Sequence, residues 1–202
     1  MSDSYKTIAR ENRIEIKVKR SRFIGTVRYV STLEAAREFI DSVSAEYHDA
    51  THNCWAYRIG IGQNQIFKYN DDGEPSGTAG KPILDAVDRH ELVDTCIVVT
   101  RYFGGIKLGT GGLSRAYRDA AISVVENGGI KTRYITERLK FTFHLQFTNV
   151  VLRTLSSEVC TTVDSEYSDV GRITCDIRRD SVEKISDTLI SQTNGRIEIE
   201  KV

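Results

Sequence analysis

The segment Arg101–Arg118 holds residue types that bind anions, because five glycines and several cations precede a helical pattern. Glycines let backbone N–H groups approach a ligand without interference from a Cβ atom. A helix that begins here adds unpaired amides and the positive end of its dipole. The segment therefore predicts a nest for phosphate groups. The residues that we assign to this phosphate- or nucleic-acid-binding site are Arg101, Gly104, Gly105, Lys107, Gly109, Gly111, Gly112, Arg115 and Arg118, with help from Lys81.

A purely structural role is the alternative for this segment. A tight turn followed by a surface ion pair between Arg115 and Asp119 would use the same residues. Two known nucleotide loops are excluded, since Ser114 stands where the dinucleotide fingerprint needs its third glycine. Lys81 lacks the upstream glycine of a Walker A loop and is followed by Pro82. What remains is a generic anion site.

The expected strength of such a site indicates the kind of ligand. Three charge-assisted hydrogen bonds of roughly 1.5–3 kcal/mol each give about 4–9 kcal/mol before the cost of ordering is subtracted. This corresponds at best to roughly micromolar binding of one phosphate. A polymer such as RNA, which engages several points at once, is the more natural partner.

The loop Asp71–Pro82 is a second dense group of polar side chains. Carboxylates at this spacing suit Mg²⁺, so the alternative function is a metal-assisted enzyme on a small phosphorylated metabolite, with Asp71, Asp72 and Glu74 around the ion. His52 would be its base. An Asp-Gly turn capped by Thr78 explains most of the same residues, so we expect no metal or other cofactor and assign no catalytic residue. We expect the following residues to contribute to a functional surface: Asp72, Glu74, Ser76, Thr78 and His52.

Lys19, Arg20 and Arg22 form a basic run next to Phe23. Cations interleaved with an aromatic ring are typical of an RNA contact. An edge strand protected by lysine and arginine explains the run equally well.

The composition is that of a globular protein, with 40% hydrophobic and 28% charged residues in 202. The formal net charge is zero, so recognition of nucleic acid must come from local clusters of charge. Cys54, Cys96, Cys160 and Cys175 are widely spaced, which favours free thiols over a disulfide framework or a zinc site. No window approaches the length of a membrane span, so we expect a cytoplasmic protein with no membrane partner.

Hydrophobic periodicity predicts a first domain over residues 1–134. A capping box of Ser31 and Glu34 should start its first helix, after two strands. A hairpin over residues 54–69 should place its aromatic face in the core. A short helix from Pro82, a buried strand over residues 95–100 and a helix from Leu113 follow.

A second domain is predicted over residues 135–202, in the order β-α-β-β-α-β of a ferredoxin-like domain. Its elements are a strand over 139–147, a helix over 148–159, strands over 161–167 and 172–177, a helix from Asp180 and a strand over 196–202. The fold class that we expect is therefore α+β with two domains.

Three groups of residues resemble motifs of the YigZ/IMPACT family. These are Lys19–Ile24, the pair His52–Tyr57 and Asp72–Pro82, and Arg101–Tyr117, of which the last is highly specific. The resemblance implies an amino-terminal two-layer α/β sandwich of the ribosomal-protein superfamily, which includes a domain of elongation factor G. A smaller carboxy-terminal ferredoxin-like domain would follow it.

The resemblance also implies a setting in translation, as an RNA- or ribosome-associated accessory protein or a regulator of translation. RNA, the ribosome or a protein of the translation machinery would be its partner. The family has no securely attached enzymatic activity, so we expect a binding protein. A protein-interaction adaptor, in which the glycine segment is only structural, is a third possibility.

Overall fold

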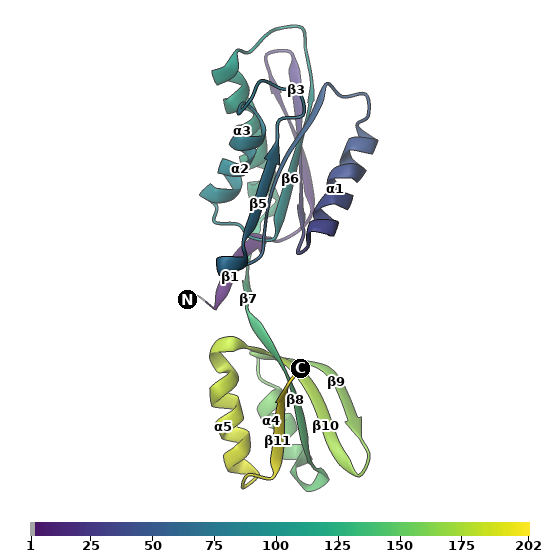
Figure 1. Cartoon of the computed structure of the whole chain (residues 1–202), viewed down its shortest axis with the longest axis vertical. Coiled ribbons are helices and arrows are strands. Elements are labelled where there is room, and N and C mark those ends of the chain that lie inside the picture. Colours follow the sequence, from purple (N-terminus) through teal and green to yellow (C-terminus); the bar gives the residue numbers. More distant parts are fainter. Residues whose placement is uncertain (1–2) are drawn as a thin grey trace. The chain divides into compact units, whose positions relative to one another are not determined.

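The computed structural model describes residues 3–202, which separate into two compact units (Figure 1). The first unit is Tyr5–Arg133, and the second is Tyr134–Val202 together with the first described residues of the chain. Each unit packs helices on an antiparallel sheet and has its own hydrophobic core. The protein is therefore a mixed α/β protein consistent with the predicted α+β class.

A five-stranded antiparallel sheet in the order β2-β3-β6-β4-β5 forms the centre of the first unit. Its strands are β2 (Asn12–Val18), β3 (Ser21–Tyr29), β4 (His52–Ile59), β5 (Ile66–Asn70) and β6 (Thr95–Tyr102). The helices of this unit are α1 (Leu33–Glu46), α2 (Gly80–Arg89) and α3 (Thr110–Gly128), with a 3-10 turn η1 (Gly62–Asn64). A separate two-stranded sheet is formed by β1 (Ser4–Ile8) and β7 (Ile130–Tyr134).

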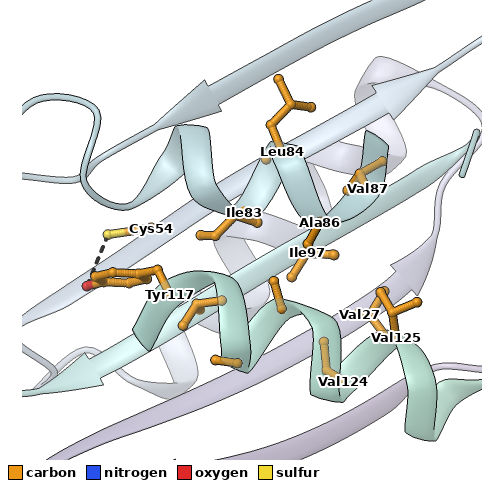
Figure 2. Packing of buried hydrophobic residues seen from close by; sticks show 14 of the residues in the cluster. Val27, Cys54, Ile83, Leu84, Ala86, Val87, Ile97, Tyr117, Val124 and Val125 are labelled. Atoms are coloured by element: carbon orange, nitrogen blue, oxygen red, sulfur yellow. Dashed lines mark hydrogen bonds between the residues drawn. The ribbon is translucent and has the colours of Figure 1, made fainter. Parts of the chain in front are cut away.

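Helices cover both faces of the five-stranded sheet. Successive side chains of the central strand β6 point to opposite faces, so each face of the sheet has a hydrophobic core. Ile97 and Val99 pack with α2 and α3, whereas Cys96 and Val98 pack with α1 on the other face. Figure 1 shows α1 on one side of the sheet and α2 and α3 on the other. Figure 2 shows the first of these cores, with α2 and α3 lying side by side on the sheet. The predicted two-layer sandwich is wrong in this respect, since a strand buried on both faces needs a helix layer on each.

Gly25 on β3 sets the distance between the sheet and α3. A Cβ atom at this position would lie 2.9 Å from the carbonyl oxygen of Ala120 and 3.2 Å from Cβ of Val124. Only glycine therefore permits the close approach through which α3 packs over β3.

The second unit has the element order strand, helix, strand, strand, helix, strand, as predicted for it. Its elements are β8 (Thr136–His144), α4 (Thr148–Leu155), β9 (Cys160–Tyr167), β10 (Val170–Arg178), α5 (Val182–Gln192) and β11 (Ile197–Lys201), with 3-10 turns η2 (Leu145–Phe147) and η3 (Arg179–Ser181). The antiparallel sheet has the order β11-β8-β10-β9. Both helices contribute to one core with the sheet, through residues such as Val151 and Leu189.

Two local predictions for the first unit need correction. Helix α1 is capped by Thr32, whose hydroxyl accepts a hydrogen bond from Ala35 N–H at 3.1 Å, and not by Ser31. The aromatic residues of the β4–β5 hairpin are only partly in the core, since Tyr57 is buried whereas Phe67 and Tyr69 are 57% and 41% exposed. The reason is that β5 is an edge strand, which has a neighbouring strand on one side only.

Across residues 3–202, none of the helices combines the length and the apolar character that crossing a membrane requires.

The close packing at Gly25 leads to a stability prediction. Gly25→Ala should lower the free energy of unfolding by about 1–3 kcal/mol, because the added methyl group meets backbone that cannot move freely. Urea unfolding followed by the fluorescence of Trp55, the single tryptophan of the chain, measures this in the first unit. Gly111→Ala is the matched control, since open space surrounds that position in α3. Gly111 is the second residue of α3, where alanine should leave stability unchanged or raise it by up to about 1 kcal/mol. Equal effects of the two substitutions would contradict the packing argument.

Candidate functional site

A cavity of about 460 Å³ lies at the amino-terminal end of α3. Its lining comes from the start of β4, the loop after β5, the end of β6 and the segment that leads into α3. The lining residues are Thr51, His52, Glu74, Pro75, Arg101, Phe103, Lys107, Leu108, Gly109, Thr110 and Leu113. The cavity thus combines cations, one carboxylate, one imidazole and an apolar wall.

A buried ion pair forms part of the cavity wall. Arg101 at the end of β6 donates from Nη1 to Oε1 of Glu74 at 2.5 Å, and both side chains are more than nine-tenths buried. Tyr117 of α3 donates its hydroxyl to the same Oε1 at 2.8 Å. The guanidinium also lies over the rings of Phe23 and Phe103, about 5.5 and 5.4 Å from their centroids. The pair therefore connects β6, the loop after β5 and α3.

Arg101 keeps one donor for a ligand. Its Nε is fully enclosed and has no acceptor among the residues of the described chain. Its Nη2 has no acceptor in the described chain either, but it is not among the enclosed atoms. Arg101 lines the cavity, and Nη2 is its outer nitrogen without an acceptor in the described chain.

His52 is held in one tautomer by the backbone. Its Nδ1 lies 2.6 Å from the carbonyl oxygen of Asp72, so Nδ1 carries a proton and donates. The other nitrogen, Nε2, lies 3.9 Å from Oε1 of Glu74. In the neutral ring Nε2 is therefore an acceptor on the cavity side.

The acids of the loop after β5 have structural partners. Asp71 accepts hydrogen bonds from the amides of Gly77, Ala79 and Gly80 at 2.8–2.9 Å, which folds the loop into the start of α2. Asp72 accepts from the Asn53 amide at 2.6 Å. Among residues 3–202 no group of three histidine, cysteine, aspartate or glutamate side chains could hold a metal ion. The carboxylates that would bind a divalent ion in the alternative function therefore already accept hydrogen bonds from the protein.

The start of α3 supplies backbone donors. The helix is preceded by Gly109 at φ +72°, and no side chain caps it. Its first helical hydrogen bond at this end runs from Leu113 N–H to the Gly109 carbonyl, at 2.9 Å. The amides of Thr110 to Gly112 have no intrahelical acceptor, as at every helix start. Gly109 and Thr110 line the cavity, so these amides lie at its edge.

Two basic segments that are far apart in the sequence meet at Gly104. A Cβ atom on Gly104 would lie 2.0 Å from the backbone of Arg20, and the Gly104 amide donates to the Ser21 hydroxyl at 3.2 Å. The turn that carries Lys19 and Arg20 is thus packed against the segment that carries Lys107. All three cations are exposed, and within the described part of the chain none of them has an ion-pair partner.

The remaining predicted residues lie elsewhere. Lys81 pairs with Asp85 at 2.7 Å, and Arg22 pairs with Glu15 at 2.8 Å. Arg115 and Arg118 lie on α3 outside the cavity lining, and the alternative pair of Arg115 with Asp119 is not formed among the described residues. The other predicted positions lie on loops or in the first turn of α3. Gly105 and Ser76 are exposed on loops, and Thr78 is buried with its hydroxyl donating to the Pro75 carbonyl at 2.6 Å. In α3, Gly111 is exposed and Gly112 is half-buried.

Tyr117 was not among the predicted site residues, although it joins the buried pair. Its side chain is fully buried in the core of the first unit. The available signal was its hydroxyl, because a buried tyrosine needs a hydrogen-bond partner. The apolar wall of the cavity, formed by Pro75, Phe103, Leu108 and Leu113, was also not predicted.

Cys54 is a buried structural thiol. It is 0% exposed, and its Sγ donates to the Asp71 carbonyl at 3.0 Å and lies 3.4 Å from the Tyr117 hydroxyl (Figure 2). Burial raises the pKa of the Cys54 thiol far above its usual range. The thiolate that a nucleophile requires is therefore disfavoured.

Comparison with known proteins identifies similar chains. The family model described as the Impact N-terminal domain matches residues 19–125. "IMPACT family member YvyE" of Bacillus subtilis is 36% identical over 201 residues, covering 100% of this chain and 92% of the relative. "IMPACT family member YigZ" of Escherichia coli is 46% identical over 102 residues, 50% of each chain. A solved structure described as "Crystal structure of an hypothetical protein" has a TM-score of 0.71 and 28% identity, covering 100% of this chain and 98% of that one.

The buried pair leads to a prediction for Glu74→Gln. This substitution leaves the Arg101 charge buried without a carboxylate, so the free energy of unfolding should fall by about 3 kcal/mol. Urea unfolding with Trp55 fluorescence measures the change. Lys81→Ala removes an exposed ion pair and should cost no more than about 0.5 kcal/mol. Similar losses of unfolding free energy in the two variants would show that breaking the buried pair costs no more than breaking an exposed one.

The burial of Cys54 predicts the order in which the thiols react. Iodoacetamide labelling of the native protein, followed by mass spectrometry, should modify the half-buried Cys160 first. Cys54 and Cys96 should be labelled only after unfolding, because burial raises the pKa of both thiols and blocks access to them. Fast labelling of Cys54 in the native protein would contradict this description of the site.

Proposed function

This chain belongs to the family defined by the Impact N-terminal domain, and on that premise we propose that it is a cytoplasmic accessory protein that binds RNA or the ribosome and acts in the regulation of translation. RNA phosphates are bound by the glycine segment, by the start of α3 and by the cations around them. A protein of the translation machinery is a further partner in this proposal. The chain acts as a binding protein.

The packing of Gly104 against Arg20 is the observation that carries the proposal. It joins the turn of Lys19 and Arg20 to the segment of Lys107 and so gathers exposed cations without ion-pair partners in the described chain. The amides at the start of α3 lie at the edge of the same region. Since the whole chain has a formal net charge of zero, attraction to phosphates depends on a local cluster of this kind.

The sheet of the second unit is less suited to binding RNA phosphates. Its polar side carries ion pairs between neighbouring strands, formed by Arg138 with Asp176, Lys140 with Glu200 and Arg172 with Glu166. Paired charges attract phosphates less than free ones do. We therefore assign the RNA contact to the first unit. The strand order β11-β8-β10-β9 supports a ferredoxin-like fold for the second unit, as in the translation factor that the family resembles.

The alternative of a metal-assisted enzyme has less support. Asp71, Asp72 and Glu74 are engaged by backbone amides or by Arg101, and Cys54 is buried. Two features are compatible with catalysis, the His52 Nε2 and the donors beside it, but the one carboxylate of the described lining, Glu74, is paired with Arg101.

The proposal predicts the salt dependence of RNA binding. Binding of a labelled single-stranded RNA, followed by fluorescence anisotropy between about 50 and 200 mM salt, should weaken in Lys107→Ala and in Arg20→Ala. Each lost phosphate contact should reduce the slope of log K against log salt by roughly 0.7.

Lys131→Ala is the matched control for this experiment. Lys131 is an exposed lysine on β7, which follows the opposite end of the 19-residue helix α3. Removing the Lys131 charge should leave the RNA affinity and the slope of log K against log salt unchanged. An equal response of the three variants, or no binding by the wild type, would overturn the proposal.

A further inference from the structure

We infer that the cavity at the start of α3 binds a single nucleotide that ends in a phosphomonoester, with the phosphate at the helix start and the base or sugar against the apolar wall. The inference rests on the proposed function and makes it specific, because it distinguishes the end of an RNA strand from the phosphates within it. A free mononucleotide presents the same chemistry as such an end.

The size of the cavity suits one nucleotide. Its volume of about 460 Å³ lies within the range of about 300–1,000 Å³ that is typical of small-molecule sites. It is lined from four segments of the chain, at residues 51–52, 74–75, 101–103 and 107–113. A phosphate inside a strand has chain on both sides and needs an open groove, whereas a terminal nucleotide can enter such a hollow from one side.

The donors match a terminal phosphate. Arg101 presents Nη2, Lys107 presents an exposed ammonium, and Gly109 and Thr110 bring the uncapped start of α3. These are three kinds of donor from three positions around one cavity. A phosphomonoester has three free oxygens and a charge of about −1.5 to −2 at neutral pH. A phosphodiester has two free oxygens and a single charge, so it uses fewer of these donors.

The buried state of Arg101 is independent support for a ligand. Its side chain is more than nine-tenths buried, and it contributes to the cavity wall with Nε unpartnered in the described chain. A guanidinium that pairs with a carboxylate frequently donates from two nitrogens, as Arg28 does to Glu11. Here the hydrogen bond uses Nη1 alone. The geometry leaves Nη2 for an anion.

The rest of the lining fits the nucleoside part. Phe103 is 45% exposed although it is aromatic, and Pro75, Leu108 and Leu113 complete an apolar wall on which a base or sugar can pack. His52 donates from Nδ1 to the Asp72 carbonyl, so its Nε2 is an acceptor when the ring carries one proton, and no hydrogen bond in the described chain uses Oε2 of Glu74. Such acceptors suit ribose hydroxyl groups, which donate hydrogen bonds.

The test compares three RNAs of one sequence that end in a 5′-phosphate, in a 3′-phosphate or in hydroxyl groups only. Anisotropy with the full chain should show at least about tenfold tighter binding of one phosphorylated form, since a lost charge-assisted hydrogen bond corresponds to roughly that factor. AMP should compete with it better than adenosine or inorganic phosphate does, because only AMP fills both parts of the cavity.

The variants distinguish binding of a terminal phosphate in the cavity from general electrostatic attraction to RNA. Lys107→Ala and Phe103→Ala should abolish the preference for the phosphorylated end, whereas Lys131→Ala should keep it. Unchanged Trp55 unfolding curves show that each variant is folded. Equal binding of all three RNAs would overturn this inference and leave the proposed function intact. Binding of AMP without binding of any RNA would support the inference and overturn the proposed function.

Discussion

A buried positive charge must be compensated within the protein, and the pairing of Arg101 with Glu74 meets this requirement at the centre of the site. The two side chains are almost fully buried and 2.5 Å apart, and Tyr117 adds a hydrogen bond to the same oxygen. A pair of this kind adds little net stability, because removing both charges from water costs nearly as much as their attraction returns. Its effect is geometric, since it joins β6, the loop after β5 and α3 at one point.

Backbone packing places the remaining donors around this pair. Gly25 lets α3 lie close on β3, and Gly104 lets the turn of Lys19 and Arg20 lie on the glycine segment. Asp71 folds the loop after β5 by binding three backbone amides, and this loop carries Glu74 to the cavity, which His52 at the start of β4 also lines. The glycines and acids that suggested a ligand site in the sequence therefore act largely through the backbone. The groups that line the cavity with exposed donors are fewer, with Lys107 and the start of α3 the main ones.

Local patterns predicted much of the fold, because they depend on near neighbours in the chain. The buried strand of residues 95–100, the helix with Leu113 in its apolar stripe and the element order of the second unit all agree with the structure. The predictions were wrong where contacts between residues far apart in the sequence decide the structure. The exposure of Phe67 follows from the edge position of β5, and the second helix layer follows from the burial of β6 on both faces.

The sequence by itself determined the types of the elements and the presence of a strand, a glycine-rich turn and a helix with cations in one segment. Periodicity and the special backbone freedom of glycine are properties of a few consecutive residues, so they can be read without coordinates. The partner of each charge was decided only by the tertiary structure. Arg101, Lys81 and Lys107 looked alike in the sequence, yet one is neutralised in the interior, one pairs on the surface and one is unpaired in the described chain. The reason is that electrostatic pairing depends on distance in space and on burial, which residues far apart in the chain set together.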